Sequence, residues 1–278
     1  MTILYVAWSV AAFALGAALG SFAALAVARI PDDEPLWSPA SRCPTCRTPL
    51  AWHDNVPLAS WVLLRARCRT CHTPIPASYP LVELTCALTG WLLFRRFVPG
   101  VSALDLPHVA AFGLYLGMAT LLAIAAFTDV RARIIPEVAS HWAIPFAIAG
   151  AGLLQLLGYD GWLDLGWKQA VLGSLVGGLV LAVPGGLWRL VLGTEGVAWG
   201  DVRLLALIGA FVGPMPGVVV VTLLACFAGV GLGAVLAFGA GRSGYLPFAP
   251  ALSLGALVYV LYGDLLVQRV FPQWLGFL

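Results

Sequence analysis

Long apolar stretches separated by shorter polar segments dominate the pattern of residues along the chain. A helix needs roughly 20 apolar residues to cross a bilayer. The pattern predicts a first span at residues 3–28, followed by a polar segment to about residue 79. Further spans are expected at residues 81–94, 107–127, 138–157, 169–188 and 250–270.

The apolar stretch at residues 201–240 is long enough for two helices. Pro214 and Pro216 are the natural place to break it, because proline removes a helical hydrogen bond and clashes with the preceding turn. The total is eight spans, or seven if the short helix before the break is re-entrant.

Composition supports a membrane protein. The 278 residues are 61% hydrophobic and 10% charged, and the mean hydropathy is +0.94. A soluble domain carries about 25% charged residues, so we expect lipid to cover much of this surface. A net charge of +2 gives no reason to expect a nucleic-acid partner. The first ten residues lack a basic segment, so we expect the first stretch to be a permanent span and not a cleaved signal peptide.

The distribution of basic residues predicts the orientation, because Lys and Arg concentrate in cytoplasmic loops. With eight spans and the polar segment in the cytoplasm, eleven basic residues fall on the cytoplasmic side: Arg29, Arg42, Arg47, Arg65, Arg67, Arg69, Arg131, Arg133, Arg189, Arg203 and Arg242. The four on the opposite side are Arg95, Arg96, Lys168 and Arg269. Both termini are then expected to face away from the cytoplasm.

The polar segment contains two CxxC pairs, which are typical of a structural zinc site. They are Cys43 with Cys46 and Cys68 with Cys71, separated by 21 residues. Four thiolates close a tetrahedral shell, and metal binding can supply the folding energy of a loop that is too short for its own core. Two disulfides or free thiols are the alternatives, although a cytoplasmic loop argues against disulfides. For the nearby His53 and His72 we expect a surface role.

Two acids at the ends of predicted spans are candidates for catalysis. Asp129 ends the third span and Asp201 opens the sixth, and both are expected at the cytoplasmic face. Two carboxylates that meet can hydrolyse an amide, because one takes a proton from water while the other, protonated, binds the scissile carbonyl. In the ordinary alternative, Asp201 caps its helix and Asp129 pairs with Arg131 or Arg133. Asp264 is expected on the far side.

The sequence resembles the type IV prepilin peptidases, also called leader peptidase/N-methyltransferases, which are membrane aspartic peptidases of the GxGD type. The resemblance spans nearly the whole chain and includes the four cysteines and both aspartates in the family's order. The other similar positions are Gly20-Ser21-Phe22, Arg29-Ile30-Pro31, Asn55-Val56-Pro57-Leu58, Tyr79-Pro80-Leu81-Val82-Glu83, Ile135-Pro136, Leu204-Leu205-Ala206 and Leu246-Pro247-Phe248.

The resemblance implies that Asp129 and Asp201 are the catalytic pair. The substrates would be prepilins and pseudopilins of type IV pili and type II secretion, each with a short basic leader before an apolar helix. Cleavage would occur at the cytoplasmic face of a bacterial inner membrane. S-adenosylmethionine-dependent methylation of the new N-terminus is implied by the resemblance alone, and its binding residues are unknown.

Several positions depart from the family pattern. Ala198 replaces the first glycine of the GxGD motif, which loses access to positive φ. Glu137 stands where Asp is usual, Arg203 where Lys is usual, Ala24 where Asn is usual and Ala249 where Gly is usual. Both aspartates remain, so the peptidase chemistry is expected to survive.

These observations predict an all-α, polytopic membrane bundle with a small zinc-ribbon-like loop. The expected parts are a first span at 1–28, a cytoplasmic zinc-binding loop at 29–80 and a peptidase core at 81–278. Three alternatives stay open: a peptidase without methyltransferase activity, a proton- or cation-coupled transporter using the same acids, and an inactive scaffold stabilised by zinc.

Overall fold

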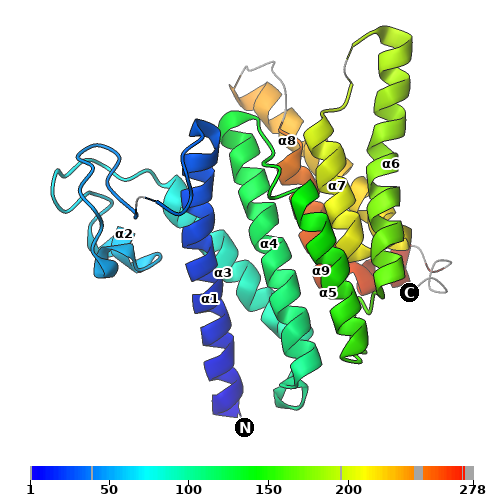
Figure 1. Ribbon diagram of the computed structural model, residues 1–278, viewed down its shortest axis with the longest axis horizontal. Helices are drawn as coiled ribbons and strands as arrows, with labels where there is room; N and C mark the ends of the chain where they lie inside the picture. The colour runs from blue at the N-terminus through cyan, green and yellow to red at the C-terminus, as the bar shows by residue number, and fades with distance from the viewer. Residues whose placement is uncertain (1, 39, 195, 241–246, 271, 273–278) are drawn as a thin grey trace.

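The computed structural model describes the chain except for residues 1, 39, 195, 241–246, 271 and 273–278, and all the long elements in the described part are helices (Figure 1). The long helices are α1 (Thr2–Arg29), α3 (Ser78–Phe97), α4 (Leu106–Ala132), α5 (Ile144–Leu156), α6 (Trp167–Leu192), α7 (Trp199–Val212), α8 (Val219–Ala240) and α9 (Ala249–Val270). The shorter elements are α2 (Ala59–Leu63) and the helical turns Ile30–Asp32, Trp52–Asn55, Val101–Ala103, His141–Ala143 and Pro214–Val218.

The predicted all-α class is confirmed for the described residues, and each expected span coincides with one of these long helices. Five described segments are long and apolar enough to cross a membrane: Ile3–Asp32, Leu106–Ala132, Trp167–Leu192, Pro214–Gly231 and Ala249–Val270. The chain therefore has the character of a multi-pass membrane protein, whereas eight crossings and their orientation stay predictions. Arg242 and Leu246, used in the charge count and the motif comparison, lie outside the described residues.

Two helix boundaries differ from the predicted ones in a way that matters for the candidate acids. Helix α4 continues to Ala132, five residues beyond the predicted end, so Asp129 lies within its last turn. Helix α5 begins only at Ile144, with proline in its first turn. The intervening residues form a short connection at the same end of the bundle. The predicted break near Pro214 is confirmed by the non-α turn Pro214–Val218.

Glycines let two pairs of helices pack with their backbones in contact. On α1, a Cβ on Gly20 would lie 2.7 Å from Cα of Glu83 on α3. On α6, a Cβ on Gly173 would collide with the carbonyl oxygen of Gly209 on α7. Small residues at such crossings are the usual means of close helix packing in membranes, where van der Waals contact replaces hydrophobic burial as the driving force.

Helix α4 lies at the centre of the bundle and fixes the position of its neighbours. It packs against α1, α3, α5 and α9. The Tyr115 hydroxyl donates a hydrogen bond to the Phe211 carbonyl at 2.8 Å, which joins α4 to α7. On its other side the Tyr115 ring stacks on Phe97 with the centroids 4.5 Å apart. The helix that carries Asp129 is thus held on all sides.

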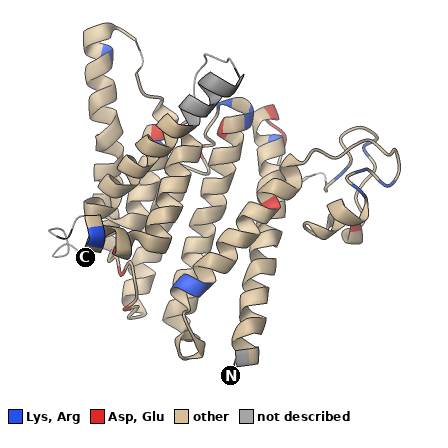
Figure 2. Ribbon diagram, turned by 180° about the vertical axis from the view of Figure 1, so that it is seen from behind, with Lys and Arg blue, Asp and Glu red and all other residues tan. Residues whose placement is uncertain are grey.

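The charged residues gather at the helix ends and in the polar loop, and the middles of the helices carry almost none (Figure 2). This is the distribution that a bilayer imposes, because a charge at its centre costs several kcal/mol. The polar loop, residues 33–77, lies beside α1 and α3 at one end of the bundle (Figure 1). Its elements are α2 and the turn Trp52–Asn55.

Candidate functional site

Asp129 is buried near the C-terminal end of α4, with 4% of its surface exposed. Its Oδ2 accepts a hydrogen bond of 3.1 Å from the backbone N–H of Ala249, the first residue of α9. The N-terminus of a helix favours a negative charge, because its first N–H groups have no partner within the helix. The structure therefore supplies Asp129 with a donor suited to a carboxylate.

Asp201 is buried in the first turn of α7 and is 5% exposed. The helix begins after Ala198, whose φ of −73° and ψ of 137° are ordinary extended values. Alanine at this position is therefore unstrained, and the predicted cost of losing a glycine here does not arise. Asp201 itself lies inside the helix and is not its N-cap residue, so capping does not account for its burial.

The two acids come from helix ends that the sequence places far apart. Gly200, the neighbour of Asp201, packs against Ile135 in the segment that follows α4. This contact draws the start of α7 to the end of α4. Asp129 in the last turn of α4 and Asp201 in the first turn of α7 therefore lie at the same end of the bundle, on either side of the Gly200–Ile135 contact.

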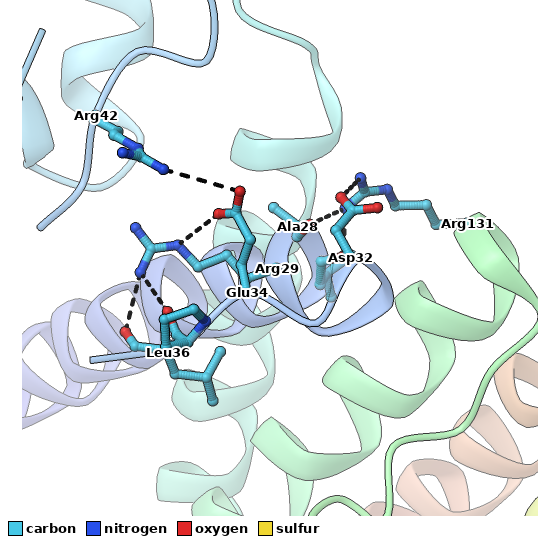
Figure 3. Close-up of polar contacts among 9 residues, drawn as sticks. Ala28, Arg29, Asp32, Glu34, Leu36, Arg42 and Arg131 are labelled. Carbon is cyan, nitrogen blue, oxygen red and sulfur yellow. Dashed lines mark hydrogen bonds and ion pairs between the residues drawn. The ribbon is translucent and has the colours of Figure 1, made fainter. Parts of the chain in front are cut away.

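Arg131 does not serve as the salt-bridge partner of Asp129. Its guanidinium instead donates hydrogen bonds to the carbonyls of Val27 and Ala28 at 2.7 and 2.6 Å. It also contacts Oδ2 of Asp32 at 3.1 Å (Figure 3). The last carbonyls of a helix have no partner within that helix, so Arg131 caps α1 from the side and ties it to the end of α4.

The same corner links α1 to the cysteine loop. Arg29 is buried and donates to the carbonyls of Pro35 and Leu36 at 3.0 and 3.3 Å. Glu34 lies between Arg29 and Arg42, at 3.9 and 4.0 Å (Figure 3). Arg42 directly precedes the first cysteine. Two groups of polar contacts therefore meet the end of α1, one from the loop and one from Arg131, two positions after Asp129.

Glu137 and Arg203, two of the departures from the family pattern, form an ion pair of 3.1 Å. Glu137 lies in the connection after α4, and Arg203 lies one turn into α7 beside Asp201. The two side chains are 62% and 42% exposed, so the pair is worth only about 0–1 kcal/mol. The pair spans the junction that also holds Asp129 and Asp201.

The four cysteines meet in the loop, with their sulfur atoms all within 4.8 Å of one another. The two CxxC turns repeat the same local structure. Cys43 N–H bonds to Thr48 and Cys68 N–H to Thr73, at 3.0 and 2.9 Å. Arg47 and His72 adopt positive φ at equivalent points. The underlying sequence repeat, CPTCRTP and CRTCHTP, is visible in the chain.

The chemistry of this donor set fits a metal ion such as zinc. A hydrogen bond with the Thr73 hydroxyl lowers the pKa of Cys71 to about 6, and one with the Thr48 hydroxyl lowers the pKa of Cys46, whereas burial raises the pKa of Cys43 to about 11 when no ion is bound. The thiolate is the form that binds metal. Four sulfurs leave no open position, as in a structural site. The cluster found among the described residues consists of the cysteines and includes neither His53 nor His72.

Glu83 is an additional important residue whose structural role sequence reasoning did not identify. It is buried at the start of α3, and its Oε2 accepts a hydrogen bond of 2.7 Å from the backbone N–H of Leu58. A hydrogen bond to a charged group contributes about 1.5–3 kcal/mol, so Glu83 anchors the cysteine loop to the bundle. Asp264, expected on the far side, pairs with Arg96 at 2.7 Å.

Two family models match the chain. Residues 14–97 match the bacterial Peptidase A24 N-terminal domain, and residues 116–234 match the type IV leader peptidase family. Both candidate aspartates lie in the second match, and the four cysteines lie in the first. No solved structure matches the chain.

Curated relatives carry the printed name prepilin leader peptidase/N-methyltransferase. One from Myxococcus xanthus is 35% identical over 84% of this chain and 64% of its own length. One from Aeromonas hydrophila is 35% identical over 87% of this chain and 79% of its own. One from Bacillus subtilis is 32% identical over 95% of this chain and 98% of its own. The match thus spans just under two thirds of the first of these relatives and nearly all of the last.

Proposed function

Because the chain belongs to the type IV leader peptidase family, we propose that it cleaves the leader from prepilins and pseudopilins with Asp129 and Asp201 as the catalytic pair. The observation that carries this proposal is the burial of two carboxylates at the junction where the end of α4 adjoins the start of α7. The curated relatives, by their printed names, act on prepilin leaders.

The proposed reaction is hydrolysis of one peptide bond. One carboxylate of the pair, ionised, takes a proton from water as the water oxygen attacks the scissile carbonyl carbon. The other, protonated, donates a hydrogen bond to the carbonyl oxygen. The C–N bond then breaks, and the amine leaves with the proton first taken from water. Repulsion between nearby carboxylates favours this singly protonated state, and the pair titrates as a unit.

The roles of the two acids follow from their surroundings. Asp129 receives the Ala249 N–H at the start of α9, which stabilises its charged form. Asp201 also lies at a helix N-terminus, in the first turn of α7, so the assignment rests on the Ala249 hydrogen bond: we assign the base to Asp129 and the protonated acid to Asp201. Gly200 has a role in packing the junction through Ile135.

Methylation of the new N-terminus is the second proposed activity, and it rests on the relatives' printed name. In this step the amine nitrogen would attack the methyl carbon of S-adenosylmethionine and lose a proton, and the S–CH3 bond would break to release S-adenosylhomocysteine. The cysteine cluster is proposed to hold zinc as a structural ion, away from both reactions. The active site and this loop are proposed to face the cytoplasm, at the inner membrane of a bacterium.

The test uses purified full-length protein and a prepilin in detergent. Mass spectrometry should find the shortened pilin with the wild-type protein and intact prepilin with Asp129→Asn or Asp201→Asn. Labelled S-adenosylmethionine in the same reaction should add one methyl group to the shortened chain. Normal cleavage by either variant would remove that aspartate from the mechanism. Cleavage without methylation would favour a peptidase alone.

A transporter is the competing class of function. Transport would place paired acids near the middle of the membrane beside broken helices. Here Asp129 and Asp201 lie in the last and first turns of their helices. This placement at helix ends favours hydrolysis of a bond at the membrane border.

A further inference from the structure

An apolar groove runs along one side of the bundle between α3, α4 and α9, with a volume of about 210 Å³. The side of the groove formed by α4 consists of six residues: Ala119, Leu122, Ala123, Ala126, Phe127 and Val130. The rise of a helix makes this side about 16 Å long, or about three turns. Three of the six side chains are methyl groups, which allow close approach, whereas Leu122 and Phe127 supply larger apolar surface.

The walls of the groove present little polar surface even where polar residues line it. The Ser253 hydroxyl on α9 bonds to the Leu122 carbonyl at 3.3 Å. The Thr85 hydroxyl on α3 bonds to the Leu81 carbonyl at 2.8 Å. Both hydroxyls are thus satisfied by helix backbone, and the groove offers its occupant van der Waals contact.

One end of the groove adjoins the candidate active site. Val130 directly follows Asp129, and Pro250 directly follows Ala249, whose N–H binds the Asp129 carboxylate. Both residues line the groove. The other side of the groove is open, since Val130 and Leu254 are 57% and 54% exposed. In a membrane this open side faces the acyl chains.

We propose that this groove binds the apolar helix of the substrate, so that the bond cleaved lies just beyond the end of that helix. The inference rests on the proposed function and deepens it. A helix satisfies its own backbone hydrogen bonds within the bilayer. Only the chain beyond its end can be extended and reach a carboxylate at the membrane border.

The shape of the groove favours a helix as its occupant. Helices associate in lipid through close packing against small residues, and the alanines at positions 119, 123 and 126 of α4 provide such a surface over about two turns. Its end at Val130 and Pro250 brings the bound helix to the level of Asp129. Binding in the groove would then fix how far the cleaved bond lies from the end of the substrate's helix.

Photo-crosslinking reads binding without requiring cleavage. A benzophenone amino acid is placed at Leu254, in full-length Asp201→Asn protein in lipid nanodiscs with a prepilin. The expected adduct joins position 254 to the first turns of the prepilin's apolar helix. The matched control places the probe at Leu179, which is 56% exposed on α6, and should give no prepilin adduct. Adducts at position 254 only to lipid or to a second copy of the chain would overturn the proposal.

A substitution supplies the second test and separates the groove from the dyad. Leu254→Trp narrows the groove at its exposed edge, where folding should tolerate it. We expect kcat/KM for prepilin to fall by about tenfold (about 1.4 kcal/mol), mainly through KM, because the larger ring occupies space that the substrate helix would fill. Leu179→Trp should cleave like wild type. Equal activity of Leu254→Trp and Leu179→Trp would contradict substrate binding in the groove. A wild-type protein that cleaves no prepilin would instead contradict the proposed function.

Discussion

Gly200 lies directly against Ile135, so closely that a Cβ on Gly200 would come within 3.2 Å of the Ile135 Cβ and Cδ1. Gly200 precedes Asp201, and Ile135 lies in the connection after the helix that carries Asp129. The contact therefore packs the start of α7 against the segment that follows Asp129. The site therefore requires glycine at position 200, because any side chain there would press against Ile135.

Enlarging Gly200 should separate the acids. We expect Gly200→Val to lower the cleavage rate by about 10²-fold, because a misplacement of about 1 Å in a catalytic group has an effect of this size. Gly186→Val on α6 is the matched control, since a Cβ there meets nothing within 4 Å. The measurement is the rate of prepilin cleavage by Gly200→Val and by Gly186→Val, each compared with wild type. A Gly200→Val enzyme as fast as the control would show that the contact does not set the geometry.

Removing the Arg131 side chain should loosen the junction between α1 and α4. Arg131→Ala leaves the carbonyls of Val27 and Ala28 without this donor. We expect a loss of stability of about 1–3 kcal/mol and a several-fold lower cleavage rate. Arg95→Ala, on α3 at the other end of the bundle, serves as the control. Thermal unfolding in detergent measures the first effect, and an unfolding temperature equal to that of the control would contradict it.

The Glu137–Arg203 pair should matter little to stability. Both side chains are largely exposed, so we expect Glu137→Gln to change the free energy of unfolding by about 1 kcal/mol or less. Glu137→Asp restores the residue usual in the family and should cleave at the wild-type rate. A loss beyond tenfold in cleavage with Glu137→Gln would instead place this carboxylate in the mechanism.

The cysteine cluster should hold one zinc ion. Metal analysis of the purified protein is expected to find one zinc per chain, and Cys43→Ser or Cys68→Ser should release it. Cys86→Ser is the matched control, because Cys86 is buried in the helical bundle on α3. Metal loss is expected to destabilise the loop, read as faster proteolysis of residues 33–77. Zinc retained at full occupancy in Cys43→Ser and Cys68→Ser would contradict the four-sulfur site.

The pattern of residues predicted the helices well because apolar length carries that information directly. It located the break near Pro214. It missed the continuation of α4 to Ala132 because Thr128, Asp129 and Arg131 are polar, although all three extend the helix. Asp129 and Arg131 also bond to other parts of the protein. The hydrophobic pattern reports burial in lipid and does not report where a helix ends at the membrane border.

The acids and cysteines of the candidate site could be picked out from the sequence, because their spacing and order along the chain form a recognisable pattern. The partners of Arg131 and Glu83 were not, since Arg131 reaches residues about a hundred positions away and Glu83 binds a backbone N–H. Neither kind of contact leaves a pattern in the sequence. The packing of Gly200 against Ile135 is likewise visible only in three dimensions.

The most direct test of the central claim compares single and double substitutions of the dyad. Groups that act as a unit lose activity non-additively. Asp129→Asn, Asp201→Asn and the double variant should therefore lower kcat for prepilin cleavage by a similar factor, with Asp264→Asn near the wild-type rate. If either single variant keeps a kcat close to that of wild type, Asp129 and Asp201 are not a catalytic pair.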